Sequence, residues 1–347
     1  MIWSLAQPSL YCFSQFSSSK TLTNQTHTFL INTPNPLSRF GSLKSKPRFG
    51  PTCFFNAGKD SKPPNIQANE TKLDWPVLKR WDVPWGWQTA SLTSLACGLS
   101  FVLTGLVETA AIPYLGVKIE ELSLDEKAEI LFLDQGITTA VVIAVLYGIS
   151  NSFKPLPEDF FQYDLREPFN LQKGWLLWAG IGLGGAILAI ALTGAAMSLF
   201  NGENPPQRET DALVQLLPLI GSSSISTACL LGITGVLAPL LEENVFRGFF
   251  MVSLTKWVPT PIAVIISAAV FAFAHLTPGE FPQLFVLETK GTSSISVGTA
   301  LGFSYAQTRN LLTPITIHAF WNSGVILLLT FLQLQGYDLK ELLQAAS

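Results

Sequence analysis

Long hydrophobic runs begin after residue 86 of this 347-residue chain, and shorter polar segments separate them. A run of about 17–25 apolar residues can cross a lipid bilayer as a helix. Seven such runs lie near residues 87–107, 130–149, 174–200, 225–250, 257–276, 293–309 and 312–334. The pattern predicts an all-α integral membrane protein, built as a bundle of about seven transmembrane helices with a range of six to eight.

Composition supports this fold class. Hydrophobic residues make up 48% of the chain and charged residues only 13%, whereas soluble domains carry about 25% charged residues. The net charge of −3 is too small to indicate a strongly acidic or basic partner, and no basic cluster predicts nucleic-acid binding. The four cysteines form no disulfide framework, which agrees with a reduced compartment or with burial.

The N-terminal region is typical of an organelle transit peptide, which we expect to span residues 1–58. These residues contain no Asp or Glu, since the first acidic residue of the chain is Asp60. They are rich in serine and threonine and include scattered basic residues. Hydroxyl richness and weak amphipathicity favour a chloroplast over a mitochondrial address. A disordered cytosolic tail is the alternative. Residues 59–86 are expected to form a polar spacer before the membrane helices.

Lysine and arginine positions predict the orientation of the bundle. With seven spans, ten of these residues fall on the side of the N-terminus: Lys59, Lys62, Lys72, Lys79, Arg80, Lys154, Arg166, Lys173, Lys256 and Arg309. Five fall on the opposite side: Lys118, Lys127, Arg208, Lys290 and Lys340. This bias predicts that the N-terminus lies on the positive side. In a chloroplast inner-envelope or thylakoid membrane, that side is the stroma.

Two glycine patterns fall inside hydrophobic runs. The spacing in Gly180–Gly185 fits a dinucleotide fingerprint, but no strand precedes it, so no nucleotide cofactor is expected. We instead expect Gly180 with Gly184, and Gly298 with Gly302, to allow close contact between helices.

Charged side chains interrupt the fourth hydrophobic run. Glu242, Glu243 and Arg247 lie there, and buried charges are costly unless they pair or line a wet cavity. Glu243 and Arg247 are four residues apart and can form an ion pair on one helix face. Glu242 is turned about 100° away, so it can accept a proton. The alternative is an interfacial charge cluster at a helix break near Pro239 and Gly248.

Two histidines lie in the later hydrophobic runs. His275 ends one run, and His318 shares a helix face with Asn322 in the last. Taken singly, such residues often cap a helix or join two helices by hydrogen bonds. Packing alone does not readily explain both histidines and a pair of glutamates in apolar helices, and intramembrane ionisable groups by default indicate a functional site.

Three motifs carry a resemblance to a known family. They are Glu-Glu-x-x-x-Arg at 242–247, Phe-x-x-x-His at 271–275 and His-x-x-x-Asn at 318–322. In this order they resemble the motifs of the CAAX protease and bacteriocin-processing family, which comprises intramembrane glutamic endopeptidases. The segments Gly298–Gly302 and 312–315, which precede the last motif, are also similar. With its transit-like N-terminus, the chain resembles a plastid member of the snowy cotyledon type.

The resemblance implies a role for each motif. Glu242 would be the general base that activates a water, and His275 would help to hold that water. His318 and Asn322 would steady the oxyanion of the tetrahedral intermediate. Glu243 and Arg247 would fix Glu242 and the substrate. The family's mechanism requires neither a metal ion nor another cofactor.

The same resemblance divides the chain and suggests a substrate class. Residues 87–222 would form N-terminal membrane helices, 223–335 the catalytic membrane core, and 336–347 a C-terminal tail. Prenylated proteins mature outside plastids, so the expected substrate is a plastid membrane protein or peptide, in the service of chloroplast biogenesis. Two alternatives remain: a zinc-dependent membrane protease that uses both histidines and a glutamate, and a non-proteolytic membrane scaffold.

Overall fold

The computed structural model describes residues 76–118, 121–200, 218–274 and 289–339. Within these ranges every regular element is a helix and none is a strand, which confirms the all-α prediction. The expected transit peptide, most of the expected spacer, His275 and residues 340–347 lie outside the described residues.

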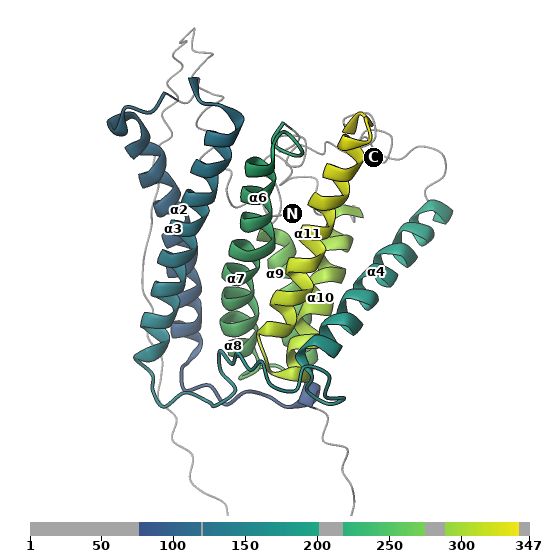
Figure 1. Cartoon of the computed structure of the whole chain (residues 1–347). Coiled ribbons are helices and arrows are strands. Elements are labelled where there is room, and N and C mark those ends of the chain that lie inside the picture. The colour runs from purple at the N-terminus through teal and green to yellow at the C-terminus, as the bar shows by residue number, and fades with distance from the viewer. Residues whose placement is uncertain (1–75, 119–120, 201–217, 275–288, 340–347) are drawn as a thin grey trace, which may run out of the picture. The chain divides into compact units, whose positions relative to one another are not determined.

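All seven predicted hydrophobic runs are found in helices (Figure 1). After a short turn of helix, η2 (Pro76–Leu78), the elements are α2 (Trp87–Ala111) with η3 (Ile112–Leu115), α3 (Leu124–Asn151), α4 (Trp175–Phe200), α9 (Thr260–Ala274), α10 (Thr289–Thr308) and α11 (Leu312–Leu334). Between α4 and α9 one unbroken helical stretch contains α6 (Ser224–Gly232), η5 (Ile233–Leu237), α7 (Ala238–Glu243), η6 (Asn244–Met251) and α8 (Val252–Leu254). The elements η5 and η6 are π-helical.

Five helical stretches in the described part of the chain are long and apolar enough to cross a membrane. They are Trp87–Leu115, Leu124–Asn151, Trp175–Leu192, Ser224–Leu254 and Leu312–Leu334. The other two predicted spans form α9, which has 15 described residues, and α10, whose first turns are rich in serine and threonine. The chain is therefore a multi-pass membrane protein.

Glycine allows α10 to approach α9 closely. A Cβ atom on Gly298 would lie 3.1 Å from the Ala268 Cβ, and one on Gly302 would lie 2.7 Å from Val264 Cγ1. This confirms the predicted contact for the pair in α10. The prediction was wrong for Gly180 and Gly184 within the described part of the chain, where their Cβ positions have no neighbouring atom within 4 Å.

The close approach in α4 occurs at Gly182 instead. A Cβ there would lie 2.3 Å from Ser304 Oγ in α10 and 2.6 Å from Ile317 Cδ1 in α11. Gly180 and Gly184 are exposed on another face of the helix. Small-residue spacing identified a helix that packs closely, but it did not identify which face makes the contact.

We expect Gly302→Ala to destabilise the protein by about 1–3 kcal/mol, because the new methyl group would clash with the β-branched Val264. Gly184→Ala is the matched control, since it adds the same methyl group to open space in α4. Thermal unfolding in one detergent measures both variants. Equal melting temperatures for Gly302→Ala and the wild type would contradict the close packing of α9 and α10.

Residues 76–86, which were expected to belong to a polar spacer, pack against the helices. Trp81, Val83 and Trp85 are buried and alternate with exposed neighbours, as in an extended chain that packs one face against a core. Trp85 stacks on Phe249 in η6 with 5.3 Å between ring centroids, and its Nε1 donates to Ser253 Oγ at 2.9 Å. This segment therefore contacts the helix that continues from the glutamates.

Several connections meet at one end of the bundle, the lower end in Figure 1. Lys256, between α8 and α9, donates to the carbonyls of Val83 and Trp85. Arg309, between α10 and α11, pairs with Asp159 in the connection from α3 to α4. Lys256 and Arg309, two of the basic residues that the sequence assigned to one side, therefore lie at the same end of the described helices.

Candidate active site

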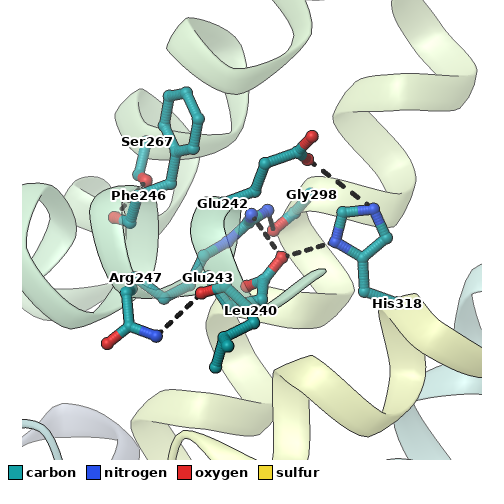
Figure 2. Close-up of polar contacts among 9 residues, drawn as sticks. Leu240, Glu242, Glu243, Phe246, Arg247, Ser267, Gly298 and His318 are labelled. Carbon is teal, nitrogen blue, oxygen red and sulfur yellow. Dashed lines mark hydrogen bonds and ion pairs between the residues drawn. The ribbon is translucent and has the colours of Figure 1, made fainter. Parts of the chain in front are cut away.

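Four of the predicted site residues meet in the interior of the bundle (Figure 2). Glu242 and Glu243 end α7, Arg247 lies in η6, and His318 lies in the second turn of α11. Their exposed fractions are 3%, 0%, 0% and 2%. The π-helical turn begins directly after the two glutamates, and such turns frequently occur at functional sites.

Arg247 is held by three different kinds of contact. Its Nη1 lies 2.9 Å from Glu243 Oε1, so the predicted ion pair is present. Its Nη2 donates to the carbonyl oxygen of Gly298 at 3.3 Å, and its guanidinium lies 4.2 Å from the centroid of the Phe271 ring. These contacts compensate for burying the positive charge and fix the position of the Glu243 carboxylate.

His318 contacts both glutamates. Its Nδ1 lies 2.8 Å from Glu243 Oε1, and its Nε2 lies 3.7 Å from Glu242 Oε2 (Figure 2). An ionised carboxylate can only accept hydrogen bonds, so Nδ1 carries a proton and donates to Glu243. This arrangement leaves Nε2 directed at Glu242.

Charge balance restricts the protonation of this cluster. Among the residues of the cluster that the structure describes, two buried carboxylates and one guanidinium give a net charge of −1 (two negative, one positive). Burying an uncompensated charge is costly, and one further proton on Glu242 or on His318 makes the cluster neutral. The two neutral forms differ only in which of the facing atoms, Glu242 Oε2 or His318 Nε2, holds that proton.

The ring of Phe271 contacts both Arg247 and His318. Besides contacting Arg247, its ring makes edge-on contacts with Phe246 at 5.1 Å and with His318 at 5.8 Å. Ser267, one turn earlier in α9, donates its hydroxyl to the carbonyl of Phe246 at 3.1 Å. The serine therefore supports η6, and aromatic rings cover the charged groups.

The remaining two predicted residues are not brought into this network by any described contact. Asn322 is buried one turn after His318, and its Nδ2 donates to the carbonyl of Thr234 in η5 at 3.0 Å. His275 follows the last described residue of α9 and lies outside the described residues. Their catalytic roles remain predictions.

Metal binding was an alternative for this site. Among the described residues, no three His, Cys, Asp or Glu side chains are grouped so that they could hold a metal ion. His275, which the zinc alternative requires, is outside that set.

Sequence reasoning missed the contact between His318 and Glu243, which lie 75 positions apart. It also missed the carbonyl of Gly298 as an acceptor for Arg247. Gly298 stood out only as a small residue, and no spacing rule identifies a backbone oxygen as a partner for a charge.

The comparisons with known proteins identify a related domain in this part of the chain. Residues 224–324 match the family model described as Rce1-like: Type II CAAX prenyl endopeptidase Rce1-like. Searches of curated proteins and of solved structures returned no match. The matched range begins at α6 and ends in α11, so it contains the whole cluster and Asn322. A protease of this kind acts on a peptide or protein substrate at the membrane, and the match supports the resemblance of residues 224–324 to the CAAX protease and bacteriocin-processing family.

Proposed function

We propose that this protein is an intramembrane glutamic endopeptidase in which Glu242 activates the attacking water. The observation that carries the proposal is that a single buried imidazole faces both glutamates, with Glu243 already paired to Arg247. Glu243 holds Arg247 and His318, and we assign proton transfer to Glu242, which faces His318 Nε2.

The active form has the extra proton on His318 and an ionised Glu242. A water that touches both Glu242 Oε2 and His318 Nε2 at hydrogen-bond length lies beside the 3.7 Å line that joins them. Glu242 takes a proton from this water as the water oxygen bonds to the peptide carbonyl carbon. Glu242 then returns the proton to the amine nitrogen as the carbon–nitrogen bond breaks, which yields a carboxylic acid and an amine.

The oxyanion needs donors in the low-dielectric site. We assign this role to His318 Nε2 and to Asn322, whose amide would have to exchange the carbonyl of Thr234 for the oxyanion. His275 would assist in holding the water, as the family resemblance implies. The assignment for Asn322 predicts that substrate binding weakens its bond to Thr234.

The proposed substrate class follows from the proposed location in a chloroplast membrane. If residues 1–58 direct the chain to a chloroplast membrane with a stromal N-terminus, its substrate is a plastid membrane protein or peptide, and its role is in chloroplast biogenesis. Import of labelled precursor into isolated chloroplasts tests the address. We expect a shortened, protease-protected product, and import without shortening would contradict the transit peptide.

Cleavage by purified protein tests the activity itself. The full chain in lipid nanodiscs is incubated with membrane peptides, and the products are read by mass spectrometry. We expect cleavage that persists in the presence of a zinc chelator, because neither proposed proton-transfer step uses a metal. Activity that the chelator removes and zinc restores would contradict the glutamate mechanism in favour of the zinc alternative.

A further inference from the structure

The residue directly after the two glutamates is held by an unusual set of contacts. Asn244 begins η6 and is 1% exposed. Its Oδ1 accepts hydrogen bonds from the hydroxyl of Tyr147 at 3.0 Å and from the hydroxyl of Tyr163 at 2.7 Å. Its Nδ2 donates to the carbonyl of Leu240 at 2.7 Å. One side chain thus ties the start of the π-helical turn to two distant segments.

The two tyrosines approach from different elements. Tyr147 lies near the end of α3, and Tyr163 lies in the connection between α3 and α4. Phe161, in the same connection, stacks on Tyr147 with 4.5 Å between centroids. The Phe161 ring also lies so close to Gly248 that a Cβ there would be 2.7 Å away. The connection therefore packs directly against η6.

This connection is anchored independently of η6. The backbone nitrogen of Leu311 donates to the carbonyl of Gln162 at 2.9 Å, and Asn310 Nδ2 donates to the carbonyl of Asp164 at 2.6 Å. Tyr163 is thus fixed on both sides by the turn between α10 and α11. Although Tyr163 itself is 41% exposed, the backbone on either side of it is held in place by these two hydrogen bonds.

The protonation of Tyr163 also suits a permanent donor. Burial raises the pKa of its phenol above the ordinary value, so the hydroxyl stays protonated at physiological pH. Because Asn244 Oδ1 can only accept, both tyrosines must donate to it. In the bonds to Asn244 the two tyrosines are therefore the donors.

We infer that Tyr147 and Tyr163 are positioning residues, which act through Asn244 to hold the π-helical turn and so aim Glu242 and Glu243 at His318. A small misplacement of reacting groups can lower a rate by about 100-fold. The inference rests on the proposed proteolytic function and adds to it two residues outside the family's motifs.

Phenylalanine substitutions test the inference with little change in shape. Tyr147→Phe and Tyr163→Phe each remove one hydroxyl and leave Asn244 one donor, whereas the double variant leaves Oδ1 with neither. We expect the double variant to lower kcat by about 10- to 100-fold at unchanged KM, more than the product of the two single effects. Tyr114→Phe, at a site 92% exposed in η3, is the matched control and should match the wild type.

Hydrogen–deuterium exchange of residues 244–251 gives a readout that does not depend on proteolysis. We expect faster exchange there in the double variant, with α4 unchanged. Unaltered exchange would overturn the inference, as would faster exchange at wild-type kcat. An equal loss of melting temperature and of active protein, with unchanged kcat per folded molecule, would also overturn it in favour of a merely structural role.

If the proposed proteolytic function is wrong, the cleavage results will differ from those that overturn the role of the tyrosines. In that case the wild type and Glu242→Gln would both fail to cleave any peptide, and the exchange measurement alone would decide whether the tyrosines hold the turn.

Discussion

Glu242→Gln is expected to lower kcat by about 10²–10⁴-fold, the range that a general base contributes. Glutamine keeps the shape of the side chain but cannot accept a proton from water. The contacts of Glu243 with Arg247 and with His318 Nδ1 do not involve Glu242, so the variant should accumulate normally. Quantitative immunoblotting and peptide cleavage on the same membranes measure the two effects.

A second intramembrane carboxyl provides the control for this substitution. Glu108 lies in α2, outside the matched protease domain. Glu108→Gln removes a carboxylate from a membrane helix without touching the cluster, so its kcat should equal that of the wild type. If both variants retained wild-type cleavage, Glu242 would not be the base.

Glu243→Gln is expected to reduce abundance as well as activity. The substitution leaves the guanidinium of Arg247 buried without its carboxylate partner, and breaking a buried pair on one side typically costs about 3–5 kcal/mol. Native proteins are stable by only about 5–15 kcal/mol, so this loss is a large fraction of the total. We expect a lower melting temperature and faster turnover of the protein in membranes.

Removing the charges of both Glu243 and Arg247 separates the effect on protein stability from the effect on peptide cleavage. Glu243→Gln combined with Arg247→Met leaves no unpaired guanidinium, so abundance should recover relative to the single variant. Cleavage should not recover, because His318 then lacks the carboxylate that orients it. Normal accumulation of Glu243→Gln alone would contradict the role of this ion pair.

The sequence predicted the parts of this structure that depend on nearby residues. Hydrophobic run length is a local property, and every predicted run is helical in the described part of the chain. The spacing of four between Glu243 and Arg247 is also local, and their ion pair is present. The close contact of Gly302 with Val264 was predicted from the spacing of Gly298 and Gly302, which is again a local property.

The missed features depend on how distant segments pack. The π-helical turn after Glu243 has no recognised spacing signal, and the approach of His318 depends on the position of α11. Gly182, not Gly180 or Gly184, contacts α10 because the rotation of α4 about its axis is set by its neighbours. The buried Trp81 and Trp85 had a signal in the alternation of large apolar residues with Asp82, Pro84 and Gly86, but the pattern is too short to be distinctive.

Complementation of a null mutant with Glu242→Ala, compared with wild-type protein at equal abundance in the membrane, tests the central claim most directly. Glu242→Ala removes the proposed base and leaves the ion pair of Glu243 with Arg247 in place. We predict that the variant accumulates normally and fails to restore the mutant. Full restoration at equal abundance would contradict proteolysis by Glu242 and would support the membrane scaffold instead.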